Sequence, residues 1–176
     1  MHKTIRKVLI IANLHKPDTE LLIGEIEKDM SERGIRTEIF GFRGKPGIPN
    51  IEDVDFVFSL GVDGTVLFSA RVLESRGIPI LAVNLGAFGF ITEVTKEEWR
   101  SAFEKYVSGE LGLSRRIMIK VMVERDGHRI ATLRGLNEAA ISSSGITKIV
   151  KLNLYLNKTS LGQYRADGVI LSTPTG

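Results

Sequence analysis

A single carboxylate in a glycine-rich turn is the residue in this sequence best placed to do chemistry. Asp63 lies in the pentapeptide Gly61–Thr65, between an apolar run that ends at Leu60 and a helix-like pattern that starts near Val66. Glycine lets the backbone approach a ligand closely, and the N–H groups at a helix start favour anions such as phosphates. A carboxylate beside a phosphate site can accept the proton of an attacking hydroxyl, so this turn suggests phosphoryl transfer with Asp63 as general base.

The same carboxylate has a simpler interpretation. Aspartate is a common N-cap residue, and Asp63 stands immediately before the predicted helix, so its side chain would cap that helix. From the pentapeptide alone, the capping interpretation is favoured over the general-base interpretation.

Three further segments place polar groups or glycines at the ends of predicted strands. The segment Val83–Thr92, VNLGAFGFIT, is a second glycine loop, but its spacing and the helix that follows do not fit the dinucleotide-binding fingerprint. Asn137 and Glu138 offer acceptors for two ribose hydroxyls, although such a pair is usually just solvated. The segment 164–176, YRADGVILSTPTG, combines a turn with several hydroxyls. Each segment alone is also typical of an ordinary polar loop.

The elements that must position these segments form an α/β pattern in the first part of the chain. Apolar runs predict strands at 7–13, 35–42, 54–60 and 78–84. Helical spacing predicts helices from Pro17 to the residue before Gly34, from Thr65 to Arg76 and after Thr95–Glu98. Alternation of strands and helices predicts a mostly parallel sheet. Loops at the carboxyl ends of its strands share one edge, so Asp63 and the second glycine loop are expected at the same edge.

The pattern changes after Gly109, where no helix-length periodicity appears. Apolar residues alternate on one face at Ile117, Ile119, Val121 and Val123, and Asp126-Gly127 indicates a hairpin turn. We therefore predict an α/β nucleotide-binding-type domain at residues 1–109 and a β-rich domain at residues 110–176. The latter is expected to be partial, with the protein continuing beyond Gly176.

Composition and charge exclude several function classes. The sequence has no cysteine, which excludes disulfides and thiolate chemistry. Its net charge of +3 is spread without blocks of like charge, so we expect no nucleic-acid partner. No apolar run is long enough to cross a bilayer and no signal-type segment follows the start, which predicts a cytoplasmic protein without a membrane partner.

Taken together and in this order, the segments resemble the NAD kinase family, whose members use ATP or polyphosphate. GVDGT matches the family's Gly-Gly-Asp-Gly-Thr, with Val62 in place of a glycine, and NLGAFGFIT matches its glycine loop. LNEAA matches its Asn-Glu element, and ADGVILSTPTG matches the opening of its Thr-Pro-Thr-Gly-Ser-Thr-Ala-Tyr signature. NLHKPD is similar to the family's first loop. The resemblance spans almost the whole chain.

The resemblance implies phosphorylation of the 2′-hydroxyl of the adenosine ribose of NAD, giving NADP, with Asp63 as the catalytic base. It also implies NAD contacts at Gly64, Phe90, Asn137, Glu138, Lys148, Arg165 and Asp167. For Lys148, a solvated strand lysine remains an alternative. Mg²⁺ or another divalent cation would arrive with the phosphoryl donor, without a metal site built from protein ligands.

The family further implies an active site in the crevice between the two domains and a homodimer or homotetramer. Two alternatives stay open. One is a related kinase acting on a lipid or sugar phosphate, because the Gly-Asp-Gly-Thr loop recurs in such enzymes, although lipid kinases are not expected to share NLGAFGFIT and STPTG. The other is a non-catalytic NAD- or NADP-binding protein, in which Val62 blocks the donor site.

Overall fold

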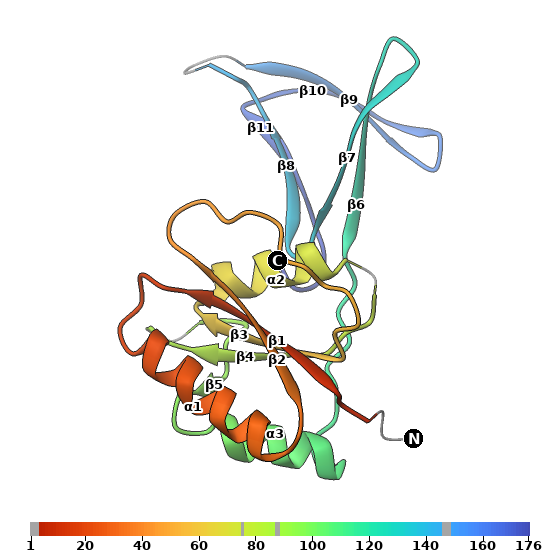
Figure 1. The fold of residues 1–176 in the computed structure, drawn as a ribbon. Helices are drawn as coiled ribbons and strands as arrows, with labels where there is room; N and C mark the ends of the chain where they lie inside the picture. Colours follow the sequence, from red (N-terminus) through yellow and green to blue (C-terminus); the bar gives the residue numbers. More distant parts are fainter. Residues whose placement is uncertain (1–3, 75, 87–88, 146–148) are drawn as a thin grey trace. The chain divides into compact units, whose positions relative to one another are not determined.

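The structure is a computed structural model that describes residues 4–74, 76–86, 89–145 and 149–176 (Figure 1). The chain divides into two compact units, Met1–Arg115 and Arg116–Gly176. The first combines helices with a sheet and the second contains strands, as the sequence pattern predicts. The resemblance also implies that residues 110–176 form an NAD-binding domain; this role, and the nucleotide-binding role predicted for residues 1–109, remain predictions.

The first unit is built on one parallel sheet with the strand order β2-β1-β3-β4-β5. Every pairing in this sheet is parallel. The predicted parallel α/β layer is therefore confirmed, and β5 is a short strand that the sequence pattern did not indicate. The strands are β1 (Lys7–Asn13), β2 (Arg36–Phe42), β3 (Phe56–Gly61), β4 (Ile80–Asn84) and β5 (Val94–Thr95).

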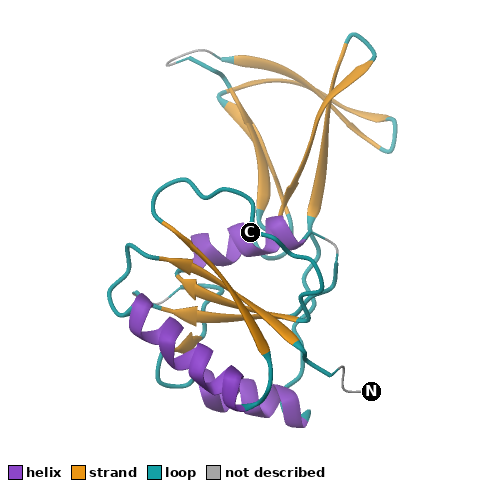
Figure 2. Ribbon diagram, viewed as in Figure 1, coloured by secondary structure: helices purple, strands orange, loops and turns teal. Residues whose placement is uncertain are grey.

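Three helices cover the two faces of this sheet (Figure 2). They are α1 (Thr19–Glu32), α2 (Asp63–Leu73) and α3 (Trp99–Ser108), and none of the described helices is long and apolar enough to cross a membrane. Helix α2 starts two residues before the predicted Thr65, because Val62 is extended and its carbonyl already accepts the N–H of Thr65 at 2.8 Å. It ends at Leu73, three residues before the predicted Arg76.

Each face of the sheet buries its own apolar cluster. Residues of α1 and α3 pack on one face against alternate residues of β1 and β3, and residues of α2 pack on the other face. The first cluster contains an aromatic group in which the rings of Phe56, Phe58 and Phe103 lie within 5.3 Å of one another, centroid to centroid. These contacts fix the sheet between two helical layers, as expected for strands that are buried on both faces.

The register of the sheet aligns the carboxyl ends of its central strands. Ala12 of β1 pairs with Leu60 of β3, and Gly61 of β3 pairs with Asn84 of β4. The loops that follow β1, β3 and β4 therefore leave the sheet at one common edge. This edge carries the loop with Asp63, as parallel strand order predicts.

The described residues of the second unit form three antiparallel strand pairs, β6 with β7, β8 with β11, and β9 with β10. Asp126 and Gly127 both have positive φ, 51° and 77°, which is the type I′ geometry expected of a two-residue hairpin loop. The predicted turn is confirmed. The strands are β6 (Ile119–Arg125), β7 (His128–Gly135), β8 (Glu138–Ser142), β9 (Val150–Leu156), β10 (Thr159–Ala166) and β11 (Gly168–Ser172).

The aromatic group yields a test of this core. Replacing the fully buried Phe103 by alanine (Phe103→Ala) should cost about 3–5 kcal/mol of unfolding free energy, since it leaves a cavity between α3 and the sheet. Leu21→Ala in α1 is the control, because Leu21 is 72% exposed and its loss should change stability by about 0.5 kcal/mol or less. Urea unfolding measures both, and equal losses would contradict the packing described here.

Candidate active site at the carboxyl edge of the sheet

The carboxylate of Asp63 accepts four hydrogen bonds from the loop that follows β4. The backbone N–H of Phe90 donates to Oδ2 at 2.8 Å. The N–H groups of Ile91 and Thr92 donate to Oδ1 at 3.1 and 3.2 Å, and the Thr92 hydroxyl donates to the same oxygen at 3.0 Å. We call this set of donors the Asp63 cradle. It joins the two glycine loops that the sequence placed at the same edge.

The cradle also sets the charge state of Asp63. Partial burial by itself would raise the pKa of this carboxyl, but the donors of Phe90, Ile91 and Thr92 together hold the pKa of Asp63 below its usual range. Asp63 is therefore an anion at neutral pH. Because the folded pKa lies below the unfolded one, these bonds stabilise the fold above the usual Asp pKa, and that stabilisation is lost as the pH falls through the folded value.

The capping interpretation of Asp63 is wrong. Val62 occupies the N-cap position of α2, Asp63 is the first helical residue, and no side-chain hydrogen bond caps the helix. The carboxylate turns instead toward donors 27 to 29 residues later in the chain. It still lies in the first turn of α2, where the helix dipole favours a negative charge.

The residues on either side of Asp63 explain the shape of the turn. A Cβ at Gly61 would overlap the buried side chain of Thr65, so only glycine lets α2 pack this closely onto the end of β3. Val62, which replaces the family's glycine, has φ −125° and ψ −176°, extended backbone that any residue adopts. The Cγ1 of Val62 lies 2.8 Å from the position that a Cβ on Gly86 would take. The valine side chain therefore fills space next to the second glycine loop, and its backbone is not strained.

Two other predicted site residues lie beside Asp63. Gly64 is exposed, and a Cβ built there would meet no atom of a residue beyond its own helical turn within 4 Å, so the residue after Asp63 borders open space. The side chain of Phe90 is 95% exposed, although its own N–H is bound to Asp63. An aromatic ring exposed to solvent to this extent is unusual and is suited to stacking on a flat ligand.

A lysine that the sequence analysis did not single out lies at the same edge. Lys16, in the loop after β1, places Nζ 3.6 Å from the position of a Cβ on Gly86. Its side chain is half-buried, and among the described residues no hydrogen bond or ion pair occupies its ammonium group. The signal that could have found it is its place in NLHKPD, directly after a strand of the parallel sheet.

In the second unit, two predicted motifs come together. Asn137 lies between β7 and β8, and Glu138 is the first residue of β8, opposite Ser172 of β11. The Thr173 N–H donates to the carbonyl of Asn137 at 2.7 Å, and the Thr173 hydroxyl donates to the Leu136 carbonyl at 2.6 Å. The STPTG segment is thus bound to the Asn-Glu element. Within the described chain, the buried Oδ1 of Asn137 has no hydrogen-bond partner.

The other predicted residues of this unit are not brought to the same place. Asp167 precedes Gly168, which pairs with Ser142 at the opposite end of the β8–β11 ladder from Glu138. That separation is about 13 Å along the strands. Arg165 is exposed on β10, opposite Lys151 of β9. Lys148 lies outside the described residues.

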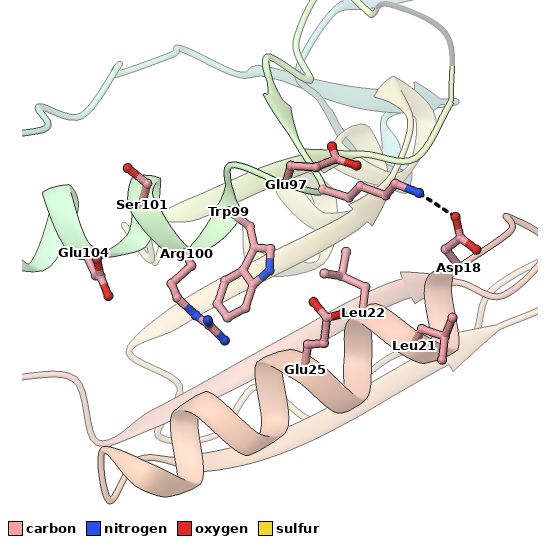
Figure 3. Close-up of a pocket in the computed structure, with 10 residues that line it drawn as sticks. Asp18, Leu21, Leu22, Glu25, Glu97, Trp99, Arg100, Ser101 and Glu104 are labelled. Atoms are coloured by element: carbon pink, nitrogen blue, oxygen red, sulfur yellow. Dashed lines mark hydrogen bonds and ion pairs between the residues drawn. The ribbon is translucent and has the colours of Figure 1, made fainter.

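Two other features of the described residues can be compared with the surroundings of Asp63, metal-binding side-chain groups and a surface hollow. The described residues contain no group of three or more His, Cys, Asp or Glu side chains that could hold a metal ion. A hollow of about 800 Å³ lies between α1 and α3, and none of the predicted site residues lines it (Figure 3). Its two cations are already paired, Lys96 with Asp18 at 2.6 Å and Arg100 with Asp29 at 3.0 Å.

The cradle predicts a strict requirement for glycine at position 89. A Cβ there would overlap both Asp63 Oδ1 and Thr92 Oγ1, so Gly89→Ala should lower the unfolding free energy by about 1–3 kcal/mol. The matched control is Gly24→Ala in α1, where a Cβ meets nothing within 4 Å. This substitution should raise the unfolding free energy by up to about 1 kcal/mol, because alanine favours the helix over glycine. Denaturant unfolding of both variants is the measurement. A neutral Gly89→Ala would show that the cradle is not formed in solution.

Comparison with known proteins places this geometry in a family. Residues 10–111 match the family model described as the ATP-NAD kinase N-terminal domain. The NAD kinase of Treponema denticola is 39% identical over 98% of this chain and 61% of its own length. The NAD kinase of Geobacter sulfurreducens is 35% identical over 98% of this chain and 63% of its own length. The chain therefore spans about three-fifths of the length of these relatives.

A solved structure supports the fold independently. The crystal structure of yeast NADH kinase complexed with NADH matches with a TM-score of 0.76, covering 99% of this chain and 59% of that chain. At 19% sequence identity this likeness concerns the fold alone. The family model covers more than half of the chain, with the Asp63 cradle inside the matched region, and the chain belongs to the NAD kinase family.

Proposed function

We propose that the whole protein phosphorylates NAD at the 2′-hydroxyl of its adenosine ribose, with ATP or polyphosphate as donor, and releases NADP. The observation that carries this proposal is an ionised carboxylate, Asp63, held at the ligand-binding edge of a parallel sheet in a chain of the NAD kinase family. The exposed ring of Phe90 and the open space at Gly64 beside it support a bound nucleotide there.

The reaction balances with one acid–base group. The 2′-oxygen forms a bond to the terminal phosphorus of the donor, and the bond between that phosphorus and the bridging oxygen breaks. The leaving phosphate chain takes the bonding electrons, and the hydroxyl proton passes to Asp63. Phosphoryl transfer depends mainly on positioning and on neutralising charge, so a carboxylate of low pKa suffices as a hydrogen-bond acceptor that orients the hydroxyl and receives its proton late.

We assign the remaining predicted residues to binding NAD. Gly64 and Phe90 would contact the nucleotide beside Asp63, and Asn137 and Glu138 would accept hydrogen bonds from ribose hydroxyls. Among the residues that the structure describes, the buried Oδ1 of Asn137 has no partner, which supports this role, because a buried acceptor without a partner costs free energy until a donor reaches it. Further NAD contacts are proposed at Lys148, Arg165 and Asp167.

The donor phosphates need positive charge, and Lys16 is the residue we propose for it. The ammonium group of this half-buried residue has no partner among the described residues, and it lies 3.6 Å from the position of a Cβ on Gly86, at the same edge as Asp63. No cluster of carboxylates among the described residues is suited to hold a cation by itself. Mg²⁺ or another divalent cation is therefore proposed to come as part of the donor complex, held largely by phosphate oxygens.

The setting of the reaction is part of the same proposal. We expect the enzyme to work in the cytoplasm. As the resemblance to the family implies, it would be a homodimer or homotetramer with NAD and ATP as its small-molecule partners. Exposed strand edges and apolar residues in the second unit, such as Ile170 at 68% exposure, are compatible with association between copies.

One observation keeps a second function in view. The Val62 side chain fills space above Gly86, where the family's glycine would leave room for donor phosphates. Such crowding would favour a second function, the binding of NAD or NADP without turnover. An assay of the full-length protein separates the two functions: NADP formed from NAD and ATP indicates a kinase, and tight NAD binding without product indicates the non-catalytic protein.

Removing the charge of Asp63 tests the proposed base. Asp63→Asn in the full-length protein should lower kcat by at least about 100-fold and leave NAD affinity within a few-fold, because general-base catalysis typically contributes that much. Asp126→Asn is the control, since it removes one carboxylate from a hairpin turn where asparagine also adopts positive φ. Coupled detection of NADP and calorimetric NAD binding provide both readouts. Unchanged turnover in Asp63→Asn would remove Asp63 from the chemistry.

The role of Lys16 is tested by comparing how its loss changes the KM for ATP and the KM for NAD. Lys16→Ala should raise the KM for ATP by about tenfold and leave the KM for NAD nearly unchanged, since one charge-assisted contact to phosphate is lost. Lys28→Ala in α1 is the control, because it removes the same charge from an exposed position on the same unit. A loss confined to NAD binding, or no effect on either substrate, would contradict this assignment.

A further inference from the structure

The hydrogen bonds to Asp63 are divided unequally between its two oxygens. Oδ1 accepts three donors, the N–H groups of Ile91 and Thr92 and the Thr92 hydroxyl. Oδ2 accepts one, from the N–H of Phe90. Each carboxylate oxygen has about two lone-pair directions. Oδ1 is therefore saturated, and Oδ2 retains a direction in which it can accept a further donor.

Thr92 supplies two of the three bonds that saturate Oδ1. Its hydroxyl is the one side-chain donor of the cradle, because the other three donors are backbone N–H groups. The residue is 3% exposed, so its hydroxyl points into the protein and is not available to a ligand. Gly89 leaves the space that lets Thr92 and Asp63 meet, since a Cβ there would overlap both side chains.

We propose that Thr92 is a positioning residue, which fixes the rotation of the Asp63 carboxylate so that Oδ1 is used by the protein and Oδ2 alone is presented to the hydroxyl that is phosphorylated. This inference rests on the proposed function and names the atom of Asp63 that receives the proton. Thr92 itself touches no reacting atom. Its effect on the reaction passes through the orientation of Asp63.

The energetics of orientation explain why one hydroxyl matters. A carboxylate rotates about its Cβ–Cγ bond, and a proton acceptor acts efficiently only when its lone pair points at the proton. Three backbone donors restrict that rotation, and the Thr92 hydroxyl adds a bond on Oδ1 that a rotated carboxylate would lose. After burial itself, the neighbours with the largest effect on the pKa of Asp63 are these hydrogen-bond donors.

The test compares two substitutions in the full-length protein. Thr92→Val keeps the shape of the side chain and removes the hydroxyl, and Thr92→Ser keeps the hydroxyl and removes a methyl group. Thr92→Val should lower kcat by about tenfold while the KM for NAD changes by less than about threefold, as expected when one orienting hydrogen bond to a reacting group is lost. Thr92→Ser should recover most of the wild-type kcat.

A second readout does not depend on turnover. The carbon-13 signal of the Asp63 carboxyl, followed by NMR against pH, should titrate below the usual Asp range in the wild type and in Thr92→Ser. In Thr92→Val the midpoint should move to higher pH, because a donor that favours the anion is gone while the burial remains. Circular dichroism and thermal unfolding check that each variant is folded.

The outcomes separate this inference from the proposed function. If Thr92→Val loses thermal stability but keeps both kcat and the Asp63 titration midpoint, Thr92 has a structural role only and the inference is overturned. If the Asp63 midpoint moves as expected in Thr92→Val but the wild-type protein makes no NADP, the cradle holds Asp63 as described and the proposed function fails. If Thr92→Ser behaves like Thr92→Val, the hydroxyl is not the group that matters, and the inference also fails.

Discussion

The structure of the site depends on one interaction, the capture of the Asp63 carboxylate by the loop at residues 90–92. Four donors hold the anion, and all come from a segment that is remote in sequence. The two loops meet because β3 and β4 are adjacent parallel strands whose ends are in register, with Gly61 opposite Asn84. Glycine at position 89 is needed for this contact, since a Cβ there would overlap Asp63 and Thr92, and glycine at position 61 is needed for the packing of α2 onto the end of β3. The fold thus produces an ionised, oriented carboxylate at the edge where parallel sheets bind ligands.

Burial and hydrogen bonding shift the pKa of this carboxylate in opposite directions, and the hydrogen bonds together have the larger effect. Partial burial would raise the pKa of Asp63, whereas the donors of the cradle hold it below its usual range. Such a group is a weak base, so its contribution to phosphoryl transfer must come from placing a hydroxyl and accepting its proton late in the reaction. A carboxylate that was raised in pKa would be protonated for part of the time and would orient the hydroxyl less well. The low pKa is therefore consistent with the proposed reaction.

Much of this arrangement could be predicted from sequence. Strand and helix periodicity predicted the parallel sheet, and parallel order placed the loops of Asp63 and Val83–Thr92 at one edge. The direction of the Asp63 side chain could not be predicted, because an aspartate in a first helical turn favours a cap and its actual donors lie 27 to 29 residues away. The pairing of β8 with β11, which joins the Asn-Glu element to Thr173, is likewise a contact between distant segments. Lys16 was missed because a lone lysine in a loop carries no periodic signal.

The most direct test of the central claim is a crystal structure of the full-length protein with NAD bound. The account predicts that the 2′-hydroxyl oxygen of the adenosine ribose lies within about 2.6–3.2 Å of Asp63 Oδ2, while Oδ1 keeps its bonds to Ile91 and Thr92. A complex in which the ribose contacts Oδ1, or in which Asp63 lies beyond hydrogen-bond reach of the 2′-hydroxyl, would contradict it.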